Sequence, residues 1–155
     1  MIRKITLAAA GLAIAATAVF SASHVGPFAF QIAARQSHMK LNGHNVYYLI
    51  GMVRGRAEYD AEAAQTAADN VVLLTQVSQG RYWPQGSDAD AIEGTKALPA
   101  IWQNFPDVVE KLNAVSAAAL ELQAVAGDGL EAMGVAVTAL NNACNACHKQ
   151  FRKTE

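Results

Sequence analysis

The sequence contains two cysteines, Cys144 and Cys147, and His148 follows the second of them directly. They fall in a stretch over residues 130–151 whose apolar residues recur in alternating steps of three and four. Residues with this spacing lie on one face of an α-helix. The chain is therefore predicted to form a helix near its C-terminal end, with two thiols on the core-facing side and an imidazole beside them.

The segment Cys144-Asn145-Ala146-Cys147-His148 has the C-x-x-C-H pattern of c-type haem attachment. On one helix, the two thiols can bond the two vinyl-derived carbons on one edge of the porphyrin. The imidazole of His148 can then bind the iron from one face of the ring. We predict one covalent haem c with its iron, attached through Cys144 and Cys147 and axially ligated by His148.

Other uses of these cysteines fit less well. A thioredoxin-like C-x-x-C belongs beside a βαβ unit, and the sequence predicts no strand. A structural zinc site needs about four ligands, and the spacing of His24, His38 and His44 matches no zinc pattern. A haem-free bundle with a disulfide is the remaining alternative, although a bridge across so short a loop constrains little of the unfolded chain.

Three further stretches have helical periodicity, at about residues 28–54, 60–78 and 106–126. Hydrophobic residues make up 52% of the chain and aromatic residues only 7%, which favours closely packed helices over a β-sandwich. We predict an all-α fold, an antiparallel (up-down-up-down) four-helix bundle with covalently bound haem. The long loop over residues 79–99 is expected to be fixed by packing of Tyr82, Trp83 and Trp102.

The N-terminus reads as a secretory signal peptide over residues 1–23. Arg3 and Lys4 precede an apolar run over residues 5–20, and small residues follow at 21–23. The run is shorter than the roughly 20 residues of a membrane-spanning helix, although an uncleaved anchor is the alternative. We expect cleavage near His24, a periplasmic location and a single haem domain over residues 24–155. That domain has ten basic and thirteen acidic residues, a net charge of −3, which argues against nucleic-acid binding.

A second axial ligand would have to come from a helix across the core. Met39 lies on the apolar stripe of the stretch 28–54, and a thioether is a good soft ligand for haem iron. A methionine on such a stripe is also common core filler, and the residues alone leave both roles open. His38 points about 100° away around the helix, and His44 lies off the stripe.

The chain resembles the cytochrome c-prime family of exported four-helix bundles with C-x-x-C-H near the C-terminus. The resemblance covers nearly all of residues 24–155. It rests on Arg35-Gln36-Ser37, Gly55 with Tyr59-Asp60, Pro99-Ala100-Ile101-Trp102, and residues 143–152.

The segment from Met39 to Asn45 is similar to the low-spin branch of that family, the cytochrome c-556-like proteins. In that branch a methionine on the first helix fills the sixth position of the iron. The resemblance therefore implies an electron-transfer protein with His148 and Met39 as axial ligands. The alternative is the high-spin branch, whose five-coordinate iron binds or buffers nitric oxide or carbon monoxide.

The resemblance also implies contacts for two arginines. Arg35 precedes Met39 by one helical turn and Arg152 follows His148 by one turn, positions that in the family lie near the propionates or the proximal imidazole. Solvated surface positions are the alternative for both. Expected partners are redox proteins of the periplasm or inner membrane, with a homodimer as a further option. No carboxylate pair, catalytic triad or phosphate-binding loop indicates an enzyme.

Overall fold

The computed structural model describes residues 26–154, so the predicted signal peptide lies outside the described residues. The helices are α1 (Ala29–Val53), α2 (Ala61–Thr75), the short 3₁₀ helix η1 (Gly80–Tyr82), α3 (Ala100–Gln103), α4 (Phe105–Val125) and α5 (Leu130–Phe151). Within residues 26–154 there is no strand, and the one isolated β-bridge joins Ala97 to Arg152. None of the helices described is long and apolar enough to cross a membrane.

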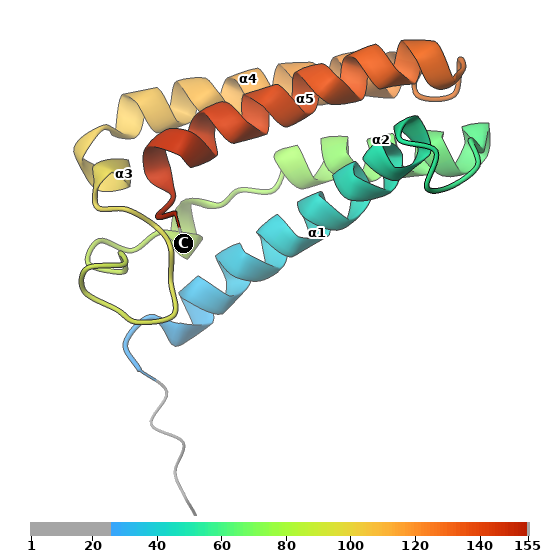
Figure 1. The fold of residues 1–155 in the computed structure, drawn as a ribbon. Helices are drawn as coiled ribbons and strands as arrows, with labels where there is room; N and C mark the ends of the chain where they lie inside the picture. The colour runs from blue at the N-terminus through green and yellow to red at the C-terminus, as the bar shows by residue number, and fades with distance from the viewer. Residues whose placement is uncertain (1–25, 155) are drawn as a thin grey trace, which may run out of the picture.

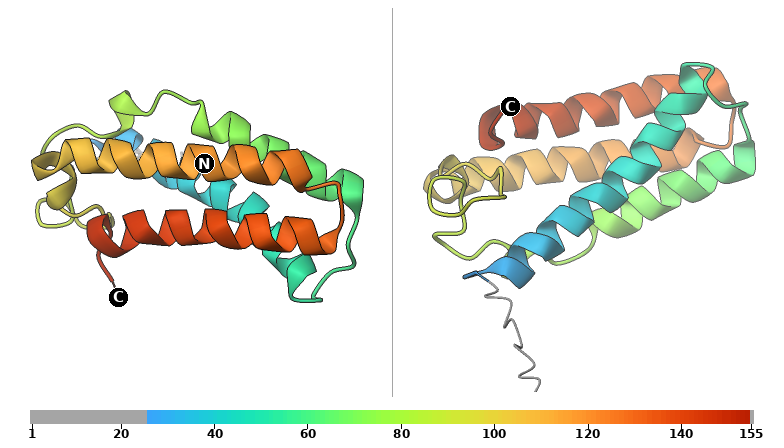
Figure 2. Two further views of the ribbon diagram at one scale, coloured as in Figure 1. Left: turned by 90° about the horizontal axis from the view of Figure 1, so that it is seen from above. Right: turned by 60° about the horizontal axis from the view of Figure 1, so that its bottom comes forward.

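The four long helices form an antiparallel bundle. Helix α1 packs on α2, α2 on α4, α4 on α5, and α5 on α1, and Figures 1 and 2 show neighbours in this ring running in opposite directions. The predicted all-α, up-down-up-down bundle is confirmed. Helix α3 was not predicted, because four residues are too few to carry a periodic pattern.

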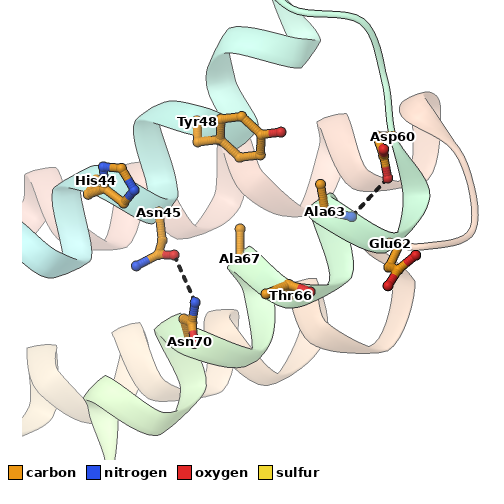
Figure 3. A pocket seen from close by; sticks show the side chains of 9 residues that line it. All are labelled: His44, Asn45, Tyr48, Asp60, Glu62, Ala63, Thr66, Ala67 and Asn70. Atoms are coloured by element: carbon orange, nitrogen blue, oxygen red, sulfur yellow. Dashed lines mark hydrogen bonds between the residues drawn. The ribbon is translucent and has the colours of Figure 1, made fainter.

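The ends of the helices follow local chemistry. Gly55 adopts the left-handed conformation, φ 65°, just past α1, where a residue without a Cβ avoids strain. The side chain of Asp60 accepts a 2.9 Å hydrogen bond from the backbone N–H of Ala63 and so caps α2, as drawn in Figure 3. Pro106 lies in the first turn of α4, where its missing N–H is not needed.

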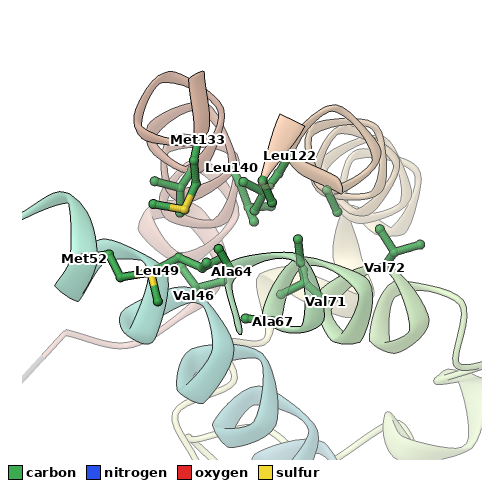
Figure 4. Packing of buried hydrophobic residues seen from close by; sticks show 14 residues of the cluster. Val46, Leu49, Met52, Ala64, Ala67, Val71, Val72, Leu122, Met133 and Leu140 are labelled. Carbon is green, nitrogen blue, oxygen red and sulfur yellow. The ribbon is translucent and has the colours of Figure 1, made fainter. Parts of the chain in front are cut away.

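A continuous apolar core joins the four long helices (Figure 4). Helix α2 contributes mainly alanines to it, which allows its neighbours to approach closely. We call this group the main core; its buried members are Val46, Leu49, Met52, Ala64, Ala67, Ala68, Val71, Val72, Ala119, Leu122, Ala126, Met133, Val137 and Leu140.

A second, smaller apolar cluster lies where α5 ends. We call it the terminal core, and its buried members are Ala97, Ile101 and Phe151. Trp83 and Trp102 pack against it, and Trp102 Nε1 donates a 3.1 Å hydrogen bond to the carbonyl of Trp83. Trp83 and Trp102 thus pack as expected for the long loop, whereas the third expected residue, Tyr82, has its ring 6.5 Å from that of His38 on α1.

The buried face of α1 differs from the predicted stripe. Periodic spacing in the sequence groups Ile50 and Val53 with Met39 on one face of this helix. The structure instead buries the residues that directly precede them, Leu49, Met52 and His38. Met39 and Val53 are each 38% exposed. Helix α1 also carries large apolar side chains on its exposed surface, such as Leu41 and Tyr47, so periodicity alone does not select its buried face.

Candidate haem site

Helix α5 places the two cysteines between the two apolar clusters. Cys144 packs against the main core and Cys147 packs against the terminal core, and both side chains are half-buried. No disulfide joins the two cysteines, and both lie on one continuous helix. The spacing read from the sequence therefore produces, in the fold, a pair of neighbouring thiols at the junction of the two clusters.

The surroundings of the thiols favour their neutral form. Burial raises the pKa of Cys144, and the neighbouring Cys147 raises it further. Burial also raises the pKa of Cys147; Lys111 opposes this effect and Asp107 adds to it. Reactive redox cysteines instead have lowered pKa values in electropositive surroundings. The site therefore lacks the electrostatics of a thioredoxin-like centre.

His148 is half-buried on the last turn of α5. Its burial lowers the pKa of the imidazole, and the positive charge of Arg152 lowers it further. Both effects favour the neutral imidazole, which is the form that binds a metal ion. Position and protonation state thus suit His148 as an axial ligand.

These residues fit a covalent haem. The main core and the terminal core are separate clusters, and the thiols that border them are only partly covered. The first part of α1 carries Met39, a large apolar side chain that is 38% exposed. A flat apolar group attached at Cys144 and Cys147 would cover surface that the chain's own side chains leave open.

The two arginines occupy different environments. Arg35 is buried, 3% exposed, and its guanidinium donates to atoms of the loop 79–99. Arg152 is exposed at the end of α5, where it lines a cleft of about 400 Å³ with Lys96, Lys153 and Thr154. The contacts of both arginines with haem propionates remain predictions.

Sequence reasoning missed three buried polar residues near α1. His38 is 7% exposed, with its ring 6.5 Å from that of Tyr82, and Ser87 and Thr95 of the loop are 0% and 8% exposed. The sequence indicates the burial of Ser87 and Thr95 only indirectly. An arginine on an apolar stripe implies buried acceptors, but the sequence does not show where in a long loop they lie.

A four-helix bundle with C-x-x-C-H at the end of its last helix defines a class of haem c proteins, and three comparisons place the chain within it. The profile of the family described as Cytochrome C' matches residues 30–152. Cytochrome c-554 of Cereibacter sphaeroides is 36% identical over 80% of this chain and 81% of that protein. Cytochrome c' of the same species is 32% identical over 97% of both chains. Relatives named cytochrome c-556 and c-555 also match, at 25–29% identity.

A solved cytochrome c' from Rhodobacter sphaeroides superposes with a TM-score of 0.81 at 30% identity, covering 84% of this chain and all of that one. The chain belongs to the cytochrome c' family. It is a haem c protein that binds iron, and the function of its class is electron transfer or gas binding.

Proposed function

We propose that the chain is a periplasmic monohaem cytochrome that transfers electrons, with haem attached at Cys144 and Cys147 and iron ligated by His148 and Met39. The observation that carries the proposal is the placement of the two thiols and the imidazole together on α5, between two separate apolar clusters. Bound haem iron supplies the chemistry, a one-electron change between ferrous and ferric states.

The chain's own residues have distinct tasks in this proposal. The thiols of Cys144 and Cys147 would hold the haem covalently on α5, and the neutral imidazole of His148 would ligate its iron. The Met39 thioether would be the second ligand of the iron and would thereby exclude added ligands. Met/His ligation also raises the reduction potential. The main core beneath Cys144 excludes water from one side of the site.

A second candidate function is binding of nitric oxide or carbon monoxide at a five-coordinate iron. Two observations favour it: the 32% identity to a cytochrome c' over nearly the whole chain, and the partial exposure of Met39. A thioether that does not reach the iron would leave the sixth position open. The two functions therefore differ in the role of a single side chain.

Optical and low-temperature EPR spectra of the exported protein, with and without carbon monoxide, separate the two. We expect a low-spin spectrum that carbon monoxide does not change, and a high-spin, carbon-monoxide-binding form in Met39→Ala. Met52→Ala is the matched control, because Met52 is a core residue of the same helix, 1% exposed; it should retain the low-spin spectrum. A wild type that is high-spin and binds carbon monoxide at once contradicts the methionine ligand.

Export and processing are part of the proposal. Residues 1–23 have the composition of a signal peptide, and haem c in a bundle over residues 24–155 fits a periplasmic protein. Intact mass of the protein recovered from the periplasm should match a chain that begins near His24 plus one haem. A cytoplasmic, full-length product would contradict this.

We further propose that redox proteins of the periplasm or inner membrane are the electron partners of this chain. We also propose that two copies of the chain form a homodimer through the α1–α2 face. This face holds a groove of about 520 Å³ lined by His44, Asn45 and Tyr48 of α1 and by α2 (Figure 3). Exposed Leu41 and Tyr47 flank the same part of α1. A solved cytochrome c' of the same fold, 24% identical, is a dimer whose dissociation a ligand controls. Sedimentation should give a dimer for the wild type and a monomer for Tyr47→Glu; a monomeric wild type contradicts it.

A further inference from the structure

The first part of α1 is packed differently from the rest of the helix. Its buried residues Ile32, Arg35 and His38 belong to neither apolar cluster, and the contribution of α1 to the main core begins at Val46. In Figure 1 and in the right-hand view of Figure 2, this end of α1 diverges from α5 and runs beside the long loop. Contacts with that loop therefore hold the segment that carries Met39.

Arg35 is the centre of those contacts. Its Nη1 donates hydrogen bonds to Ser87 Oγ at 2.7 Å and to the carbonyl of Tyr82 at 3.3 Å. Its Nη2 donates to Thr95 Oγ1 at 2.7 Å and to the carbonyl of Ser87. The guanidinium also lies 4.8 Å from the ring of Trp83. Four bonds use all four hydrogens on the terminal nitrogens.

The loop residues that accept these bonds are themselves fixed. Ser87 is 0% exposed, and its hydroxyl donates a 2.7 Å hydrogen bond to the carbonyl of Pro84 while it accepts from Arg35. Thr95 is 8% exposed. A buried guanidinium is stable only when its N–H groups are satisfied, so release of the loop would leave both the charge and its acceptors unpaired.

The same loop is tied on its other side to the end of α5. The N–H of Leu98 donates a 3.0 Å hydrogen bond to the carbonyl of Phe151, and the N–H of Lys153 donates one of 2.8 Å to the carbonyl of Lys96. The β-bridge between Ala97 and Arg152 lies between them. These contacts begin three residues after His148, just as the contacts of Arg35 lie four residues before Met39.

We propose that Arg35 is a positioning residue: it latches the loop 79–99 to α1, and the loop thereby sets the spacing between the helix segments that carry Met39 and His148. The latch decides whether the thioether occupies the sixth position of the iron or leaves it open to an added ligand. This inference rests on the proposed function, in which Met39 is an axial ligand. It gives Arg35 a role in selecting the ligand, beyond any contact with a propionate.

The test uses the haem-loaded, exported protein at a temperature well below its unfolding midpoint. Arg35→Gln removes the charged guanidinium, and Thr95→Val removes one hydrogen-bond acceptor of that guanidinium at nearly constant side-chain volume. Gln36→Ala is the matched control, since Gln36 neighbours Arg35 and donates a single exposed 2.8 Å bond to the carbonyl of Gly94 in the same loop. The readouts are the rate of carbon monoxide binding to the reduced protein, the low-spin fraction, and amide exchange at Leu98 and Lys153.

We expect Arg35→Gln to speed carbon monoxide binding by about tenfold or more, because loss of a hydrogen bond to a charged group shifts an opening equilibrium by at least that factor. Thr95→Val should give a smaller increase of the same kind, and Gln36→Ala none. Amide exchange at Leu98 and Lys153 should accelerate in the same order. If Arg35→Gln does not fold, Thr95→Val carries the test alone.

Two results overturn the inference. One is a wild-type carbon monoxide rate and low-spin fraction in Arg35→Gln and Thr95→Val, with or without faster exchange. The other is unchanged exchange at Leu98 and Lys153 in Arg35→Gln. Failure of the proposed function looks different: the wild type itself binds carbon monoxide at once and Met39→Ala changes nothing. In that case the inference is overturned together with the proposed function, whatever amide exchange in Arg35→Gln shows.

Discussion

The two ends of the bundle are built by different means. At the end where α1 meets α2, the chain fills its own interior: Leu49, Met133 and Leu140 are all 0% exposed. At the other end, Met39 is 38% exposed and the thiols of Cys144 and Cys147 are only partly covered. There the contacts are hydrogen bonds from Arg35 to a loop and a small terminal core.

This difference shows where the chain relies on its own side chains and where it relies on a bound group. A core of apolar side chains is stable because each buried methylene contributes about 0.8 kcal/mol. A site for haem must instead leave apolar surface for the ring to cover. The segments around that surface are then held in place by polar contacts, such as the hydrogen bonds of Arg35. Substitutions at the two ends should therefore have different consequences.

The largest effect is expected from loss of the attachment residues. The double substitution Cys144→Ser with Cys147→Ser should abolish covalent haem, because a hydroxyl does not form the thioether. Denaturing electrophoresis with a haem stain and intact mass measure this directly. Asn145→Ala, an exposed position within the same motif, is the control and should retain one haem. A double variant that still carries covalent haem would refute the site.

A large cavity at the packed end should affect stability without affecting the iron. Leu49→Ala removes a fully buried side chain from the main core, and such changes cost about 2–5 kcal/mol. Chemical denaturation should show this loss, while the optical spectrum and carbon monoxide binding stay as in the wild type. Phe30→Ala, on the same helix but 77% exposed, should change stability by less than about 0.5 kcal/mol. A changed iron spectrum in folded Leu49→Ala would show that the two ends are not independent.

A smaller, pH-dependent effect is expected at Asp69 on α2. Hydrogen bonds of 2.9 Å from the side-chain amides of Gln123 and Gln65 lower the pKa of this carboxyl. Because the folded pKa lies below the unfolded one, the stabilisation is present above the ordinary pKa of about 3.9 and is lost as pH falls through the lowered value.

Asp69→Asn should therefore reduce the free energy of unfolding at neutral pH by less than about 1 kcal/mol, since the carboxylate is partly exposed and solvent screens it. The difference from wild type should shrink as the pH falls below about 4. Denaturation curves at several pH values measure this, and Gln123→Ala should show the same trend. A difference that grows toward acid pH would reverse the assigned sign.

The sequence was informative wherever apolar periodicity and local caps determine structure. It predicted the four long helices, because their periodicity and their ends, such as those at Asp60 and Gly55, depend on neighbours in the chain. It grouped Cys144, Cys147 and His148 for the same reason.

Long-range contacts were not predictable in this way. The burial of His38, Ser87 and Thr95 depends on how a loop of some twenty residues folds back onto α1. The buried stripe of α1 was misplaced by one position at His38 and Leu49, because this helix carries apolar side chains on its exposed face as well as on its buried face. Whether Met39 binds the iron depends on a spacing between helices that no local pattern encodes.

The central claim is that haem completes one end of the bundle while side chains complete the other. Amide hydrogen exchange, compared between the haem-loaded wild type and the haem-free double cysteine variant, tests it most directly. We predict that exchange accelerates in residues 32–42 and 144–151 and stays slow in residues 46–52 and 133–140. Equal acceleration at both ends, or no acceleration around Arg35 and His148, would contradict the account.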